Sequence, residues 1–136
     1  MRILVDTNIL ISAALNAKGT PYKAFLKAVT HPNKGLICDQ NIEELRRIFN
    51  RKFPDKIKIL EHFLSIALLA MEVVSTPKDE IEEEYKIRDV ADRPILRAAI
   101  KVQADILLTG DKDFLESSVK VPKIMTATEF LNMPCY

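Results

Sequence analysis

Several aspartates in this sequence follow or precede apolar segments, at positions where their side chains could act together. Asp6 follows the apolar residues 3–5, and Asp111 and Asp113 follow a second apolar run. Asp92 stands just before a segment with helical apolar spacing. A charged group that ends a buried strand is costly to dehydrate, and neighbouring carboxylates raise one another's pKa. A compensating charge is therefore expected wherever these acids meet.

The ions Mg²⁺ and Mn²⁺ suit such a set of carboxylates. Both prefer oxygen ligands and keep bound waters that can become nucleophiles. Two such ions can clamp an in-line attack on a phosphodiester, one activating the water and the other stabilising the leaving oxygen. No competing zinc set or nucleophile stands out: His31 and His62 are isolated and expected at the surface, Cys38 is expected in the core, and Cys135 has no metal-binding neighbour.

Length and composition predict one globular domain over residues 1–136. The hydrophobic fraction of 48% is enough for a self-supporting core. With 20 basic and 19 acidic residues, the net charge is +1, so nucleic-acid binding would depend on a local basic patch and on metal. The longest apolar run, residues 63–71, is too short to span a membrane, and nothing at the N-terminus resembles an export signal. We expect a cytoplasmic protein without a membrane segment.

The spacing of apolar residues predicts strands that alternate with helices. Expected strands lie at residues 3–5, 35–38, 73–74, 105–109 and 123–125. Expected helices follow residue 9, begin at the Thr20–Pro21 pair and after the capping Asp39, open at residue 54, and cover 94–100 and 126–131. Residues 110–113 are expected to form a turn, and the charged residues 78–88 a loop or a solvated turn of helix.

Alternating strands and helices imply an α/β fold of three layers, with a central, mostly parallel sheet of about five strands. In open parallel sheets, ligands bind beyond the carboxyl ends of the strands. Asp6, Asp111 and Asp113 follow strands, and Asp92 begins a helix that leads into one. Glu44 lies about one turn along the helix after the second strand, from where its side chain can reach the same edge.

Four segments in order resemble the motifs of PIN domains. Residues 6–11 (Asp-Thr-Asn-Ile-Leu-Ile) look like the opening motif, 42–45 like the second acidic motif, 92–96 like the third, and 109–114 like the last. The resemblance spans nearly the whole chain. Within the family, the chain resembles the bacterial and archaeal branch described as toxin components of toxin and antitoxin pairs, near VapC.

This resemblance implies an endoribonuclease whose site uses Mg²⁺ or Mn²⁺. The acids implied at the metal are Asp6, Glu44, Asp92 and Asp111, with Asp113 as an accessory ligand. Thr7, Asn8 and Thr109 would orient carboxylates or water. Glu44 is preferred to Glu43 because the family places its acid directly before leucine, whereas Arg93 stands where many relatives carry a second acid, which leaves open whether one metal binds or two. The partners implied are RNA, an antitoxin protein and a second copy of the chain.

A basic group is the candidate contact for RNA phosphates. Its members are Arg46, Arg47, Arg51 and Lys52, on and after the second-motif helix, and Lys112 between two acids. An ordinary exposed helix face explains the first four equally well, and Lys112 could simply offset the charge of its neighbours. Taken singly, the acids could likewise be helix caps and turn formers. Their gathering at one predicted edge favours the catalytic interpretation.

Three other functions share parts of this pattern. A dehalogenase-like phosphatase needs a second aspartate two residues after the first, where this chain has Asn8. A phospho-receiver module shares the α/β fold and an acidic site, but requires a phosphorylatable aspartate after the third strand, where residues 75–77 are Ser-Thr-Pro. A PIN domain that has lost catalysis could serve as a scaffold, although such a protein would be free to lose acids that are all present.

Overall fold

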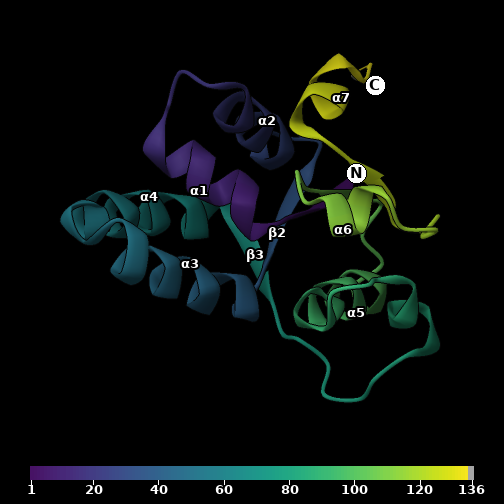
Figure 1. The fold of residues 1–136 in the computed structure, drawn as a ribbon. Coiled ribbons are helices and arrows are strands. Elements are labelled where there is room, and N and C mark those ends of the chain that lie inside the picture. Colours follow the sequence, from purple (N-terminus) through teal and green to yellow (C-terminus); the bar gives the residue numbers. More distant parts are fainter. Residues whose placement is uncertain (135–136) are drawn as a thin grey trace.

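The computed structural model describes residues 1–134 and has a single parallel sheet between layers of helices (Figure 1). The strands are β1 (Arg2–Val5), β2 (Lys34–Cys38), β3 (Met71–Val74), β4 (Ile106–Leu108) and β5 (Lys123–Met125). The helices are α1 (Thr7–Leu15), α2 (Thr20–Val29), α3 (Asp39–Lys52), α4 (Ile57–Ala70), α5 (Arg93–Lys101), α6 (Lys112–Leu115) and α7 (Ala127–Asn132). Short 3₁₀ turns cover η1 (Pro54–Lys56), η2 (Glu82–Lys86) and η3 (Val90–Asp92).

The five strands lie in the order β3-β2-β1-β4-β5, and every neighbouring pair is parallel. The predicted three-layer α/β fold is therefore confirmed. The strand order reverses direction between β1 and β4, because the chain winds one way from β1 to β3 and the other way from β4 to β5. In such sheets, this reversal opens a crevice beyond the carboxyl ends of the two central strands.

Alternate residues of the central strands fill two separate cores, as the two-residue period of a strand requires. Ile3 and Val5 of β1 pack with α1, α2, α3, α4 and α7 on one face of the sheet. Leu4 packs on the other face, against α5 and the Phe114 side chain of α6. Because β1 is covered on both faces, its three apolar residues are fully buried, and the chain can turn polar only where the strand ends.

Three local predictions need correction. Gly19 rather than Thr20 is the N-cap of α2, with Pro21 in its first turn, because the backbone of Gly19 is still extended. Asp39 lies inside the first turn of α3, and Cys38 is the cap. Residues 112–115 form the short helix α6 rather than a turn, since the Asp111 side chain accepts a hydrogen bond from the backbone N–H of Asp113 and so caps a helical turn.

The single residues outside the acidic set lie mostly as predicted. His31 and His62 are exposed, and Cys38 is buried in the core beneath α5. The expectation for Cys135 concerns a residue outside the described range of 1–134. Within that range, no helix is both long enough and apolar enough to cross a membrane.

Candidate active site

The crevice between β1 and β4 holds the first and last of the predicted acidic segments. Asp6 directly follows β1, and Thr109 and Asp111 follow β4, which pairs with β1 through Val5 and Leu108. The backbone N–H of Asp6 donates to the Leu108 carbonyl at 2.9 Å, so the sheet itself brings these segments together.

Asp6 is a buried carboxylate held by hydrogen bonds on both oxygens. The Thr109 hydroxyl donates to Oδ2 at 2.8 Å, and the backbone N–H of Thr7 donates to Oδ1 at 2.8 Å. Burial is the largest influence on its pKa, which rises to about 6, and the nearby charges of Glu44 and Asp111 add to the rise against the lowering effect of the two hydrogen bonds. The Asp6 carboxylate is thus oriented by neutral donors, and no cationic side chain of residues 1–134 forms an ion pair with it.

Asn41 contributes to this site, although the sequence motifs did not indicate it. Its side chain is fully buried, and its Nδ2 donates to Thr7 Oγ1 at 2.8 Å and lies 3.5 Å from Asp6 Oδ1. Its Oδ1 also accepts from the Cys38 backbone N–H at 3.3 Å. One amide therefore links the start of α3 to the end of β1. No sequence signal marked Asn41, because a polar residue near the start of a helix is ordinary.

The second acidic motif presents Glu44, and not Glu43, to the edge. Glu44 is half-buried and close enough to raise the pKa of Asp6, whereas Glu43 is exposed. The nearest guanidinium nitrogen, on Arg47, lies 3.8 Å from Glu44 Oε2, and the Arg47 side chain is itself 68% exposed. Glu44 therefore keeps a carboxylate available to a cation at the edge.

Asp92 has the least satisfied carboxylate of the group. Its Oδ2 atom is buried and has no hydrogen-bond partner within the described part of the chain. Burial raises the pKa of Asp92 to about 8, helped by the charge of Asp111, a hydrogen bond with Asp111, and the charges of Asp6 and Asp89. A buried acceptor without a donor costs free energy, and a cation is the group that would satisfy both the atom and its charged neighbours.

Asp89 and Arg88 are further members of the edge that the motifs did not indicate. One carboxylate oxygen each from Asp89, Asp92 and Asp113 lie within 4.8 Å of one another. Arg88 donates to Asp113 Oδ1 from Nε at 3.0 Å and from Nη2 at 2.7 Å. Asp113 is thus close to the acids but shared with an exposed arginine. The signal for Asp89 was its place three residues before Asp92.

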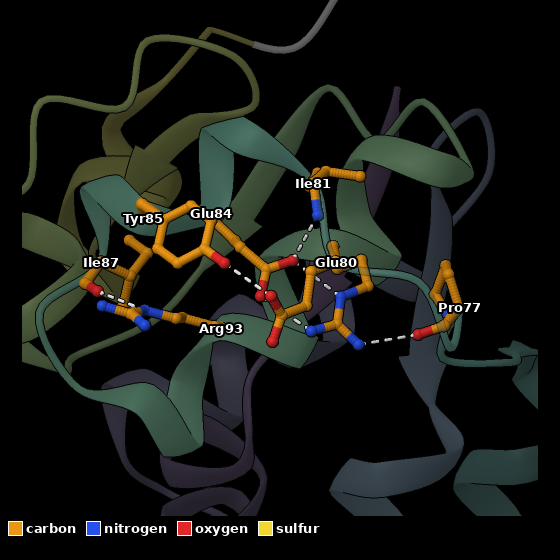
Figure 2. A network of polar contacts seen from close by, with 8 residues as sticks. Pro77, Glu80, Ile81, Glu84, Tyr85, Ile87 and Arg93 are labelled. Atoms are coloured by element: carbon orange, nitrogen blue, oxygen red, sulfur yellow. Dashed lines mark hydrogen bonds and ion pairs between the residues drawn. The ribbon is translucent and has the colours of Figure 1, made fainter.

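A buried ion pair anchors the charged segment before α5 (Figure 2), so the prediction of a solvated segment is wrong at Glu84, whereas Glu80, Glu82 and Glu83 are exposed as predicted. Glu84 is only 1% exposed, and Arg97 of α5 donates to its two oxygens at 2.8 and 2.7 Å. The pKa of Glu84 falls below its ordinary value, chiefly through the hydrogen bond from Arg97. A guanidinium provides paired donors for both carboxylate oxygens, which is why this acid can be buried.

The predicted RNA-binding cations do not form one patch beside the acids. Arg46 donates to Glu61 of α4 at 3.0 Å, and Arg47 lies beside Glu44. Arg51 and Lys52 are exposed in the last turn of α3, which begins at the acidic edge, so they lie on the order of 20 Å along the helix from that edge. Lys112 is exposed at the start of α6, next to Asp111 and Asp113.

Comparison with known proteins agrees with this architecture. A family model described as "PIN domain" matches residues 2–113. A chain in the crystal structure of VapBC2 from Rickettsia felis, bound to a DNA fragment from their promoter, superposes with a TM-score of 0.70 at 18% sequence identity, covering 93% of this chain and 98% of that one. No curated protein matches the chain.

Proposed function

The chain belongs to the PIN-domain family, and from that premise we propose that it is an endoribonuclease that hydrolyses RNA phosphodiester bonds with Mg²⁺ or Mn²⁺. The observation that carries the proposal is the unpaired carboxylate set at the β1–β4 crevice. Asp6 and Asp92 both have raised pKa values, and Asp92 has a buried oxygen without a donor. Acids that repel one another in a buried crevice are the arrangement that a divalent cation stabilises.

The residues at the edge fit such an ion. The acidic side chains at the edge offer carboxylate oxygens as ligand atoms, which Mg²⁺ and Mn²⁺ prefer. Asp6, Glu44, Asp92 and Asp111 would hold the ion, with Asp89 and Asp113 at its margin. When bound, the ion supplies a water of lowered pKa and charge stabilisation for the phosphate oxygens.

The surrounding residues would keep these acids in place during the reaction. Thr109 and the backbone of Thr7 orient the two oxygens of Asp6, and Asn41 ties Thr7 to the second acidic motif. Asn8 accepts a hydrogen bond from the Gly110 backbone N–H at 3.2 Å and so links the first and last motifs. Because these hydrogen bonds form between groups of the protein, the acids are already oriented and need little rearrangement when a phosphate binds.

The path proposed for an RNA strand bound at the acids is a neighbouring groove of about 380 Å³. Asn8 and Gly110 border the groove at the acidic end. The hydroxyl groups of Ser12, Thr20 and Thr128 line the rest together with the apolar side chains of Ile9, Pro21 and Ala127, so the lining carries no charge and suits sugar and base atoms. Lys112 stands at the acidic edge as the predicted phosphate contact.

We also propose a cellular role as a toxin held inactive by an antitoxin protein, together with a homodimeric and cytoplasmic state. The resemblance of the four motifs to toxin components supports this role, and so does the fold shared with a chain of the VapBC2 complex. A phospho-receiver is the weaker candidate because Thr76, in the segment after β3, already bonds Asp39 through its hydroxyl at 2.7 Å and offers no carboxylate.

The function is tested by cleavage of a mixed single-stranded RNA in Mn²⁺, with and without EDTA. The parent protein is expected to cleave only when metal is free, and Asp6→Asn to lose on the order of 1,000-fold in rate while remaining folded by circular dichroism. A folded Asp6→Asn variant that cleaves as fast as the parent would contradict the proposal. Metal binding without cleavage would favour a catalytically silent or receiver-like site.

A further inference from the structure

The segment between β3 and α5 contains little to hold it in place except a set of polar contacts. Apart from short 3₁₀ turns, residues 75–92 form no regular structure, and Ile87 is their only fully buried apolar residue. Yet this segment carries Asp89 to the acidic edge and ends at Asp92, the N-cap of the packed helix α5. The backbone path into these two acids therefore depends on how the segment is fastened to α5.

Two arginines of α5, one helical turn apart, make the fastening contacts. Arg97 binds both oxygens of Glu84 and also donates to the Pro77 carbonyl at 2.9 Å. Glu84 Oε1 in turn accepts from the Ile81 backbone N–H at 2.7 Å (Figure 2). One buried ion pair thus ties the beginning and the middle of the segment to the helix that Asp92 begins.

Arg93 fastens the end of the same segment. Its Nε donates to the Ile87 carbonyl at 2.9 Å, and its guanidinium lies 5.0 Å from the centre of the Tyr85 ring (Figure 2). Asp89 follows Ile87 by two residues, so the backbone enters the acidic edge from a fixed point. Among residues 1–134, no group donates a hydrogen bond to Asp92 Oδ2, so no contact at that atom replaces this support.

We propose that the Glu84–Arg97 pair is a positioning element for the third acidic motif: it sets where Asp89 and Asp92 stand and thereby the affinity of the site for a divalent cation. The inference rests on the proposed metal-dependent function. A buried ion pair is a costly way to stabilise a fold, since apolar residues of similar size serve as well or better. Its value here is conformational, because paired charges bind in one geometry and apolar contacts tolerate several.

The chain offers a closely matched control for this idea. Glu83 precedes Glu84 and also forms an ion pair, with Lys86 at 2.8 Å, but its side chain is 51% exposed. Glu83→Gln and Glu84→Gln therefore remove the same charge from adjacent positions, and only the second removes the buried tie to α5. Arg97→Lys is a second variant, which keeps the charge but cannot bind both oxygens of Glu84 with a planar fork.

The test is the dissociation constant for Mn²⁺, measured by electron paramagnetic resonance on folded parent and variants, with hydrogen exchange of residues 86–92 in the same samples. Glu84→Gln and Arg97→Lys are expected to weaken Mn²⁺ binding by about 10-fold or more and to speed exchange, whereas Glu83→Gln leaves both unchanged.

Equal Mn²⁺ affinity in Glu84→Gln, Arg97→Lys and Glu83→Gln would overturn the positioning role while leaving the proposed function intact. Failure of both Glu84→Gln and Arg97→Lys to fold would also overturn it, because the pair would then be a requirement of the fold. A parent protein that binds no Mn²⁺ would instead overturn the proposed function, and the inference with it.

Discussion

Two regions of this domain bury carboxylates, and they stabilise them in opposite ways. Glu84 is 1% exposed and accepts hydrogen bonds from Nε and Nη2 of Arg97, so its pKa is lowered. Asp6 is 6% exposed and Asp92 has a buried oxygen without a donor, and the pKa of each is raised, to about 6 and about 8. In the first region, a side chain of the protein neutralises the buried carboxylate. In the second region, the described residues provide no such cation for Asp6 and Asp92.

In these two regions, the partners of a buried acid, and not its burial, distinguish a structural role from a functional one. Glu84 has a cation of the protein within hydrogen-bond distance. The acids at the crevice between β1 and β4 have mainly neutral donors and one another. A charge missing from the protein is then expected from a ligand, which is why the crevice, and not the more deeply buried Glu84, is the candidate metal centre.

The largest expected effect on stability is at the paired acid. Glu84→Ala should lower the free energy of unfolding by about 3 kcal/mol, because it leaves the Arg97 charge buried without its partner. Urea unfolding measures this, and Glu83→Ala, which breaks an exposed ion pair, should change stability by less than about 0.5 kcal/mol. Equal losses in the two variants would remove the distinction between a buried pair and a solvated one.

Replacing an unpaired acid is expected to raise the free energy of unfolding instead of lowering it. The pKa of Asp92 rises from the ordinary 3.8 to about 8, so the folded state retains a proton that the unfolded state has lost between these values. The contribution of Asp92 to stability is therefore fully present below pH 3.8 and is lost as the pH rises through about 8.

In metal-free buffer, Asp92→Asn should thus be more stable than the parent by about 1 kcal/mol at pH 8, with the gain vanishing near pH 4. Urea unfolding at the two pH values measures it. A variant less stable than the parent at pH 8 would mean that the Asp92 carboxylate has a stabilising partner.

The smallest expected effect concerns Asp113, which lies close to Asp89 and Asp92 and also forms an ion pair with Arg88. Arg88 binds Asp113 Oδ1 but has a side chain 75% exposed, so the pair contributes at most about 1 kcal/mol. Arg88→Ala should free Asp113 and strengthen Mn²⁺ binding, by up to about 5-fold. Weaker Mn²⁺ binding in Arg88→Ala would show that Arg88 supports the acids instead of competing for one of them.

The fold and part of the site were predictable because they depend on local patterns. A strand buried on both faces needs a continuous apolar run, and a parallel sheet places whatever follows its strands at one edge. Asp6 and Asp111 were therefore found from their positions alone. The strongly charged character of the segment between β3 and α5 was visible in the same way.

The contacts that decide the role of each acid were not predictable, since they depend on residues distant in sequence. Glu84 stands in a charge run that looks solvated, and only the fold brings Arg97, 13 residues later, against it. Asn41 looked like an ordinary polar residue at the start of a helix, and its contact with Thr7 crosses 34 positions. Asp89 lies in the segment that Arg93 and Arg97 of α5 fasten by hydrogen bonds.

The central claim is that the unpaired acids form a cation site, and the most direct measurement is the melting temperature at pH 8 with and without millimolar Mn²⁺, for the parent and for Asp92→Asn. A ligand that binds only the folded state stabilises it by about 2.7 kcal/mol at 100 times its dissociation constant. The account predicts a rise of several degrees in the parent and little or none in Asp92→Asn. No rise in the parent, or an equal rise in both proteins, would contradict it.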